Sequence, residues 1–225
     1  MHNDIMQKKE LIAHLEQRIT ENKRQKINEV LVNRTNHVVV VLEDLFQEHN
    51  ASAVVRSVEC FGIQDLYVVQ EKFRFSMVAG IAMGSSKWTS MHNHRDIASA
   101  YKSLKDQGYR IVATTPHEGS HTLESLPLEG KFALVFGTEN SGLSSQALEM
   151  ADEFVSIPMY GFTQSFNVSV SVAICLYHIT STLRLSSIPW RLSEVQALDI
   201  KLSWLRRMIR GAAEHEREFL QDKAK

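Results

Sequence analysis

Hydrophobic residues recur at helical spacing near both ends of the chain. In the first part of the chain they are Leu11, Leu15, Ile19, Ile27, Val30 and Leu31. In the last part they are Leu198, Leu202, Leu205 and Ile209. An amphipathic helix must bury its apolar stripe, either against the rest of the chain or against a partner chain. We therefore predict helical extensions over residues 1–36 and 184–225.

Between these ends the pattern changes to short runs of β-branched and aromatic residues, separated by stretches with helical spacing. The predicted strands are Val38–Leu42, Leu66–Val69, Arg110–Ala113, Phe132–Phe136 and Phe154–Ile157. The predicted helices lie near Ala51–Phe61, Ile97–Gln107, Ser144–Ala151 and Asn167–Leu183. This alternation is typical of an α/β domain, a mostly parallel sheet with helices on both faces. We place the domain at residues 37–183 and expect its site in the loops after the strands, where such folds bind ligands.

Residues 154–183 contain no Lys, Arg, Asp or Glu, and a segment of this length could cross a bilayer. Its polar side chains, Asn167 and His178 among them, are too numerous for lipid, so we predict a buried core element with a polar site and no membrane partner. The N-terminus lacks the apolar run of a secretory signal, and Cys60 and Cys175 alone cannot build a disulfide framework. We therefore expect a cytoplasmic protein.

The 25 Lys and Arg residues nearly balance the 26 Asp and Glu residues, but the charges are unevenly distributed. Residues 1–36 carry seven basic and five acidic side chains, residues 184–225 carry nine and six, and the middle carries nine and fifteen. Locally basic segments can neutralise the phosphates of a nucleic acid. The candidate RNA contacts are Lys8, Lys9, Lys23, Arg24, Lys26, Arg206, Arg207 and Arg210. The alternative is that these charges only solvate the outer faces of the helices.

One predicted helix carries a single cation in apolar surroundings. In the segment His49–Arg56 we expect Asn50 to cap the helix, with Arg56 nearly two turns further on. A guanidinium among Ala, Val and Ser side chains requires an anionic partner. That partner is either a ligand or, in a purely structural role, Glu59 or Asp44.

Two further loops follow predicted strands. Residues 136–144, FGTENSGLS, hold two glycines whose backbone amides could bind a ligand, although their spacing matches neither a Walker loop nor a dinucleotide fingerprint. An ordinary strand-to-helix turn is the alternative. Residues 157–170 place Gly161, Gln164, Ser165 and Asn167 beside bulky apolar groups, a mixture typical of small-molecule pockets. Helix capping would explain only one of these polar residues.

The chain shows no sequence signal for a metal site or a reactive thiol. Its paired histidines lack the acidic or thiol cluster that would complete a ligand set. They are His92, His94, His117 and His121. Cys60 and Cys175 lie in apolar helical stretches, so we predict that both are small core side chains.

Taken in order, the three segments resemble the three sequence motifs of the SpoU/TrmH family of SPOUT RNA methyltransferases. The motif residues are Asn50 and Arg56 in the first, Gly137, Glu139 and Gly142 in the second, and Ile157–Met159, Gly161, Ser165 and Asn167 in the third. One difference is Ser171, which stands where the third motif usually has Ala. The order of elements agrees over about residues 25–185, and the short helical ends resemble those of the tRNA guanosine-18 subgroup.

The resemblance implies an α/β fold with a C-terminal trefoil knot and a homodimer with the active site near the interface. It implies transfer of a methyl group from S-adenosylmethionine to a ribose 2′-hydroxyl of tRNA, at the D-loop guanosine in position eighteen. By resemblance the backbone of Thr114, Gly137, Ile157, Met159 and Phe166 holds the cofactor. The implied catalytic set is Arg56, Asn50, Glu139, Ser165 and Asn167, in which Glu139 supports its loop and Ser165 and Asn167 shape the pocket.

The role of Arg56 is open at this point. The family assigns the general base to this position, yet a guanidinium stays protonated at neutral pH and accepts a proton poorly. A substrate phosphate could orient Arg56, or could take the proton while Arg56 stabilises the developing alkoxide.

Three alternatives compete with the tRNA methyltransferase. A ribosomal RNA ribose methyltransferase shares the motifs, but about 36 residues before the first strand are too few for a separate RNA-binding domain. A non-catalytic RNA-binding protein on the same fold is disfavoured because Asn50 and Arg56 are intact. A flavodoxin-like binder of another small ligand would fail to bind S-adenosylmethionine.

Overall fold

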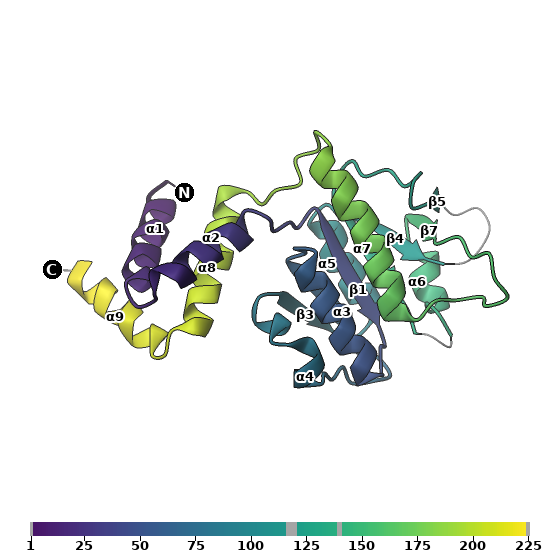
Figure 1. Ribbon diagram of the computed structural model, residues 1–225, viewed down its shortest axis with the longest axis horizontal. Helices are drawn as coiled ribbons and strands as arrows, with labels where there is room; N and C mark the ends of the chain where they lie inside the picture. Colours follow the sequence, from purple (N-terminus) through teal and green to yellow (C-terminus); the bar gives the residue numbers. More distant parts are fainter. Residues whose placement is uncertain (1, 116–120, 139–140, 224–225) are drawn as a thin grey trace. The chain divides into compact units, whose positions relative to one another are not determined.

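The computed structural model describes residues 2–115, 121–138 and 141–223 (Figure 1). The chain divides into two compact units. Residues 35–190 form an α/β unit, and residues 1–34 together with 191–225 form a helical unit.

Within the described residues, one parallel sheet of seven strands forms the centre of the α/β unit. The strands are β1 (Val38–Glu43), β2 (Asp65–Val69), β3 (Ser90–His94), β4 (Arg110–Thr114), β5 (His121–Thr122), β6 (Phe132–Phe136) and β7 (Glu153–Ser156). Their order across the sheet is β3-β2-β1-β6-β4-β7-β5. In this register Val40 of β1 lies between Leu66 of β2 and Leu134 of β6. All six residues of β1 are buried, as expected of a parallel strand covered on both faces.

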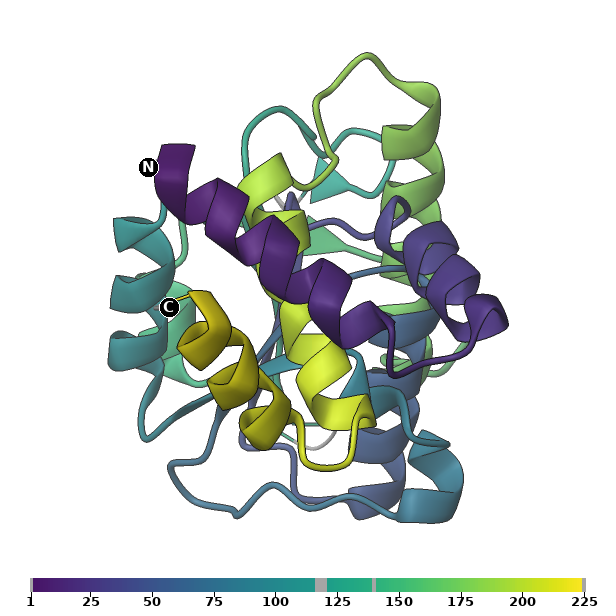
Figure 2. The same cartoon turned by 90° about the vertical axis from the view of Figure 1, so that its left-hand side faces the viewer.

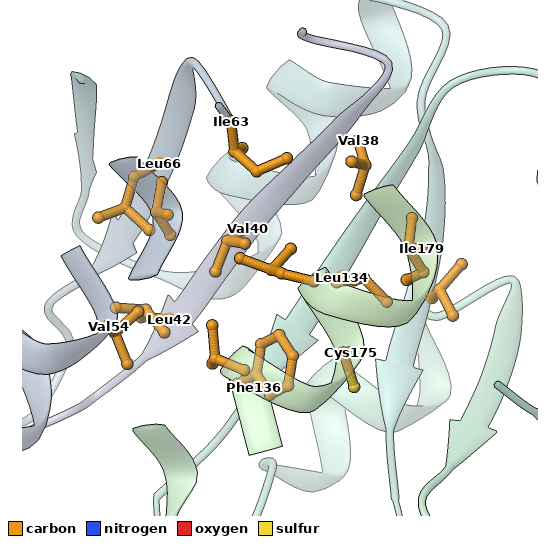
Figure 3. Packing of buried hydrophobic residues seen from close by; sticks show 14 of the residues in the cluster. Val38, Val40, Leu42, Val54, Ile63, Leu66, Leu134, Phe136, Cys175 and Ile179 are labelled. Carbon is orange, nitrogen blue, oxygen red and sulfur yellow. The ribbon is translucent and has the colours of Figure 1, made fainter. Parts of the chain in front are cut away.

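Helices cover both faces of this sheet (Figure 1). On one face α3 (Glu48–Cys60) packs beside α7 (Val168–Leu185), and α3 also contacts the short helices α4 (Ala79–Ala82) and η1 (Ser85–Lys87). The other face is covered by α5 (Ile97–Asp106) and α6 (Ser145–Glu149). Alternate side chains of β1 enter the two cores, because successive residues of a strand point to opposite faces. Figure 3 shows Val38, Val40 and Leu42 in the core beneath α3 and α7.

The connections diverge at the boundary between β1 and β6. The chain leaves β1 through α3 toward β2, whereas it leaves β6 through α6 toward β7 on the other side and the other face. Adjacent strands whose connections separate in this way leave a crevice at their carboxyl ends, where α/β folds bind ligands.

The helical unit consists of α1 (His2–Glu16), α2 (Glu21–Leu31), α8 (Glu194–Met208) and α9 (Ala212–Lys223) among the described residues. Figure 2 shows α1 lying against α8 and α9, and α2 also contacts α8. The apolar stripes of the two ends of the chain are therefore buried against each other. The core includes Leu15, Trp204 and Leu205, and the buried guanidinium of Arg34 lies 5.3 Å from the Trp204 ring centroid.

The α/β architecture and all five predicted strands are confirmed. The strands β3 and β5 were not predicted, because β3 is a polar edge strand with the sequence SMHNH and β5 has only two residues. The N-terminal apolar stripe belongs to two helices rather than one, since Thr20 caps α2 by accepting a hydrogen bond from the amide of Lys23. The trefoil knot stays a prediction.

One local prediction is wrong. The helix α3 begins before Asn50, with Gln47 in the N-cap position, so Asn50 lies in its first turn and does not cap it. The predicted core element is found in α7, whose buried face includes Val172, Cys175 and Ile179, although its other face exposes Val170, Tyr177 and Leu185. Among the described residues, α7 is the one helix long and apolar enough to cross a membrane, and 39% of that 18-residue span is buried.

Candidate active site

A cavity of about 450 Å³ lies at the carboxyl ends of β4, β6 and β7. Its walls come from the loops after these strands and from the first turns of α7. The residues predicted to hold a cofactor all line it, namely Thr114, Gly137, Ile157, Met159 and Phe166. Polar side chains are contributed by Thr138, Gln164, Ser165 and Ser171. The structure therefore brings the second and third sequence motifs together around one cavity.

The loop after β6 is folded back tightly on itself. The backbones of Thr138 and Gly142 exchange two hydrogen bonds of 3.0 Å, and the hydroxyl groups of Thr138 and Ser141 lie 2.7 Å apart. Gly142 has a φ of +66°, a conformation that favours glycine. A Cβ at Gly137 would lie 2.2 Å from the carbonyl carbon and oxygen of Gly142, so a side chain at Gly137 cannot fit. Glu139 lies outside the described residues.

A buried carboxylate fixes the far end of the same loop. Glu43, the last residue of β1, accepts hydrogen bonds from the amide of Ser144 at 2.8 Å and from its hydroxyl at 2.6 Å. Ser144 in turn caps α6 by accepting a hydrogen bond from the amide of Ala147. A charge-assisted contact thus joins the end of β1 to the start of α6.

The first and third motifs meet at two asparagines. Asn167 caps α7 and accepts hydrogen bonds from the amide and hydroxyl of Ser169. Its Nδ2 donates to Oδ1 of Asn50 at 3.2 Å, while Nδ2 of Asn50 donates to the side chain of Gln47 at 2.6 Å. Asn167 stands between Phe166 and Val168, which both line the cavity, so this contact ties the start of α3 to the cavity rim.

Arg56, unlike these hydrogen-bonded asparagines, has a side chain without a partner among the described residues. Its side chain is exposed on α3 and is not among the residues that line the cavity. Across residues 2–115, 121–138 and 141–223 it makes no hydrogen bond or ion pair, so the structural pairing with Glu59 or Asp44 is not formed. Asp44 instead accepts hydrogen bonds from three backbone amides. Arg56 is therefore available to an anionic ligand from outside the chain.

The aromatic residues of the third loop are turned outward. Tyr160 and Phe162 are almost fully exposed, and Phe166 is partly exposed where it lines the cavity. Cys175 forms part of the cavity wall, and its burial raises the pKa of the thiol to about 12. Cys60 is exposed, which corrects the prediction that both cysteines are core side chains.

No metal site is evident in the described part of the chain, where no group of three His, Cys, Asp or Glu side chains could hold an ion. His92 is bonded to Asp65 at 2.8 Å, and His121 lies in β5. His117 is outside the described residues.

The predicted RNA contacts of the helical unit differ in their pairing. Arg24 pairs with Glu21, Lys26 with Glu29, and Arg206 with Glu216 through two hydrogen bonds. Lys8 and Lys9 also pair, with Asp199 and Glu194. Lys23 and Arg210 are exposed and form no side-chain pair with the described residues, and Arg207 is exposed too.

Sequence reasoning missed two residues that shape the site, Glu43 and Ser144. They are separated by 101 positions, so their contact depends on β1 and β6 being neighbours. The available signal was local: Glu43 is an acidic residue that ends a strand of four valines and a leucine.

Comparisons with known proteins agree with this geometry. The SpoU rRNA Methylase family matches residues 37–177. A tRNA (guanosine(18)-2′-O)-methyltransferase of Borreliella burgdorferi is 40% identical over 211 residues, which cover 94% of this chain and 95% of that protein. An enzyme of the same name from Thermus thermophilus is 34% identical over 158 residues, 70% of this chain and 81% of that protein.

Solved structures show the same architecture. The A. aeolicus TrmH/SpoU tRNA modifying enzyme superposes with a TM-score of 0.76 at 31% identity, covering 84% of this chain and 98% of the other. The SpoU methyltransferase AviRb from Streptomyces viridochromogenes, in complex with AdoMet, shares the fold with a TM-score of 0.61 at 19% identity, over 68% of this chain and 63% of that one. With its second and third motifs gathered around one cavity, a family match over residues 37–177 and a relative that is 40% identical over 94% of this sequence, this chain belongs to the SpoU rRNA Methylase family.

Proposed function

We propose that this protein transfers the methyl group of S-adenosylmethionine to the ribose 2′-hydroxyl of guanosine 18 in tRNA. The observation that carries the proposal is the 40% identity to a tRNA (guanosine(18)-2′-O)-methyltransferase over 94% of this chain and 95% of that protein. That match includes the helical ends as well as the α/β unit. Within the proposal, residues 37–183 are the methyltransferase domain, and the extensions 1–36 and 184–225 bind the tRNA.

The cavity fits S-adenosylmethionine. Its volume of about 450 Å³ is within the range of small-molecule sites, and its lining combines polar and apolar surface in nearly equal amounts. Gly137 leaves backbone in place of a side chain at the wall, as a ligand held by main-chain groups requires. Thr114, Gly137, Ile157, Met159 and Phe166 would hold the cofactor. When bound, it supplies an electrophilic methyl group.

The remaining work falls to the protein's own side chains. They must align the ribose 2′-oxygen with the methyl group and help its proton leave. Asn50 and Asn167, bonded to each other, hold the start of α3 against the rim of the cavity. Ser165 lines the cavity and shapes it. Glu139 lies outside the described residues, and its role in supporting the loop after β6 is carried over from the family motif. Arg56 acts as a cation that binds a substrate phosphate or the oxygen on which charge develops.

The activity is tested with labelled S-adenosylmethionine and an unmodified tRNA transcript. A second transcript, in which another nucleotide replaces guanosine 18, serves as the control. Methylation of the first transcript alone supports both the reaction and the position. Methylation of both would show that guanosine 18 is not the methylated nucleotide. Methylation of neither, with the cofactor bound, would contradict a tRNA substrate and favour ribosomal RNA.

The role of Arg56 is tested by substitution. We expect Arg56→Ala to lower kcat by at least about a hundredfold, because a cation that stabilises transition-state charge contributes on this order. Arg56→Lys should keep part of the activity if the role is electrostatic and little if it is bidentate. Since Arg56 is exposed, the thermal midpoint should not change. Near-normal turnover of Arg56→Ala would exclude both roles.

We propose further that the protein acts in the cytoplasm as a homodimer and that a second copy, not a membrane, covers the exposed face of α7. Val170 and Tyr177 lie seven residues apart on α7, and therefore on one side of the helix, and both are exposed. The loop before α7 exposes Tyr160 and Phe162 as well. Large apolar side chains left exposed together on one element are typical of an interaction site. Sedimentation should show a dimer for the native chain and a monomer for Tyr177→Glu. A native monomer that binds lipid vesicles would contradict this proposal.

A further inference from the structure

The α/β unit is acidic, and most of its cations are already engaged. Residues 35–190 hold ten Lys and Arg side chains against fifteen acidic ones. Six of the cations make an ion pair, a hydrogen bond or a ring contact: Lys87, Lys102, Lys105, Arg110, Lys131 and Arg184. In the described part of this unit the side chains of the other four make none, namely Arg56, Lys72, Arg74 and Arg95. All four are exposed.

Three of these free cations lie at one edge of the sheet. Lys72 and Arg74 follow the end of β2, and Arg95 directly follows the end of β3. Carboxyl ends of neighbouring parallel strands meet at the same edge, which is also the edge that holds the cavity. On an acidic unit, this is where an anionic polymer can approach without repulsion.

The segment after β2, residues 70–78, is held in a defined conformation by side chains of other segments. We call it the β2 loop. Asp44, which has a φ of +52°, accepts hydrogen bonds from the amides of Glu71, Lys72 and Phe73 at 2.9, 2.8 and 3.3 Å. At its other end, the hydroxyl of Ser52 on α3 accepts a hydrogen bond from the amide of Val78 at 2.8 Å. The loop is therefore fixed to both β1 and α3.

The β2 loop presents an aromatic pair to solvent between its cations. Phe73 lies between Lys72 and Arg74 in sequence, and its ring centroid is 5.3 Å from that of Phe46. Both rings are about half exposed, at 46% and 40%. Leaving two large apolar rings in water is unfavourable, and Phe75 and Met77 of the same loop pack on the core instead.

A short series of contacts connects this pair to the proposed catalytic residues. Phe46 immediately precedes Gln47, whose side chain accepts a hydrogen bond from Asn50. Asn50 is bonded to Asn167 at the cavity rim. The aromatic pair and the cavity are thus attached to the two ends of one hydrogen-bonded group at the start of α3.

We propose that Phe46 and Phe73 form a stacking platform for a nucleobase of the RNA substrate, with Lys72, Arg74 and Arg95 binding the adjoining phosphates. This inference rests on the proposed function and assigns it a second set of RNA contacts, outside the basic helical ends. Aromatic side chains beside exposed cations match the two parts of a single-stranded nucleotide, its flat base and its charged backbone. The D-loop of tRNA supplies unpaired bases of this kind.

The platform is tested by binding of an unmodified tRNA transcript to the full-length protein, measured without methyl transfer. Phe73→Ala should weaken the Kd about tenfold, the effect expected from loss of one base stack. Phe73→Leu keeps apolar contact but no aromatic ring, so it should weaken binding similarly, and Phe73→Trp should stay within about twofold of the native protein. The Kd for S-adenosylmethionine should be the same in all four proteins.

The phosphate contacts are tested by the salt dependence of the same binding. Replacing Lys72 and Arg74 together by serine should reduce the slope of log K against log salt by about 1.5, because two phosphate contacts are lost. The matched control replaces Lys102 and Lys105 of α5 together by serine, which removes the same amount of positive charge. These two lysines already pair with Asp106 and Asp152. The control should keep the native slope.

The outcomes separate this inference from the proposed function. If Phe73→Ala and the Lys72 and Arg74 double variant bind tRNA with the Kd of the native protein, the platform is overturned, even if the enzyme methylates guanosine 18. If the native protein binds tRNA but transfers no methyl group, the proposed function fails and the Kd ratios still decide the platform. If Phe73→Ala changes the sedimentation of the protein instead of its tRNA affinity, the pair is a subunit contact and the inference is wrong.

Discussion

At the scale of the residue, Gly137 shows how the absence of a side chain shapes the cavity. It directly follows β6, and its α-carbon lies so close to the backbone of Gly142 that only a hydrogen atom fits between them. The loop can therefore turn back at once and place its backbone along the cavity wall.

Substitution of Gly137 should damage both the loop and the site. Gly137→Ala places a Cβ 2.2 Å from backbone atoms, so the loop must move, at a cost of about 1–3 kcal/mol in unfolding free energy. We expect a lower thermal midpoint and at least a tenfold weaker affinity for S-adenosylmethionine, measured by calorimetry. Gly161→Ala is the control, because no heavy atom lies within 4 Å of its added Cβ. Equal behaviour of the two variants would contradict the close approach.

The two cysteines should differ in reactivity. Burial raises the pKa of the Cys175 thiol to about 12, so almost no thiolate forms at pH 8, and the side chain is also out of reach of a reagent. Cys60 is exposed. Iodoacetamide at pH 8 should therefore label one cysteine in the native protein and two in urea, as counted by mass spectrometry. Peptide mapping that finds the native label on Cys175 would contradict this assignment.

At the scale of the element, the start of α6 depends on a residue from a distant strand. Ser144 caps the helix, and its hydroxyl also donates a hydrogen bond to the buried carboxylate of Glu43. Loss of the hydroxyl therefore removes a cap and leaves a buried carboxylate oxygen without that donor.

We expect Ser144→Ala to lower the free energy of unfolding by about 2 kcal/mol, measured with urea. The same substitution at Ser193, the N-cap of α8, provides a matched control that loses a capping box but no buried carboxylate contact. It should cost about 1 kcal/mol. Only Ser144→Ala should also weaken cofactor binding, since the loop before α6 borders the cavity. A similar loss of cofactor affinity in both variants would show that the cap acts through general stability.

The sequence was informative about elements whose burial is uniform. Strands such as β1 and β6 are buried along their whole length, so their continuous apolar runs were recognisable without a structure. The strand β3 was not, because it lies at an edge of the sheet, where polar side chains replace the apolar signal. A helix boundary was misplaced at Asn50 because α3 begins two residues earlier, at Glu48, and the Asn50 side chain contacts Gln47 and Asn167.

The candidate site followed from the sequence only in part. The motif residues were identifiable by their resemblance to a family, and the structure gathers those of the second and third motifs at one cavity. The contact of Glu43 with Ser144 and the pairing of Phe46 with Phe73 were not predictable, since each joins residues far apart in the chain. The order of strands decides such contacts, and local periodicity carries no information about that order.

At the scale of the whole molecule, charge is divided between the two units. The helical unit has fifteen basic and eleven acidic side chains, whereas the α/β unit has ten and fifteen. Under the proposed function, the helical unit would supply the long-range attraction of RNA phosphates, and the α/β unit would contribute through its few free cations.

Free and paired cations of the helical unit should contribute unequally to tRNA binding. Replacing Lys23 and Arg210 together by serine should reduce the slope of log K against log salt by about 1.5, since neither side chain is paired with a described residue. Replacing Lys26 and Glu29 together leaves the net charge unchanged and should leave the slope unchanged. Filter binding at several salt concentrations measures both. An unchanged slope in the first variant would move the RNA contacts to other residues.

The helical unit is built from both sides of the α/β unit in the sequence, and this has a consequence for biosynthesis. The α/β unit is one continuous segment whose first and last residues meet, as the hydroxyl of Thr35 donates to the carbonyl oxygen of Trp190. It can fold as soon as Trp190 has left the ribosome. The helices α1 and α2 are synthesised first but must wait for α8 and α9 before their apolar faces are covered. The part of the enzyme that carries the cavity is therefore complete before the basic helical unit, so a nascent chain could bind the cofactor before that unit has folded.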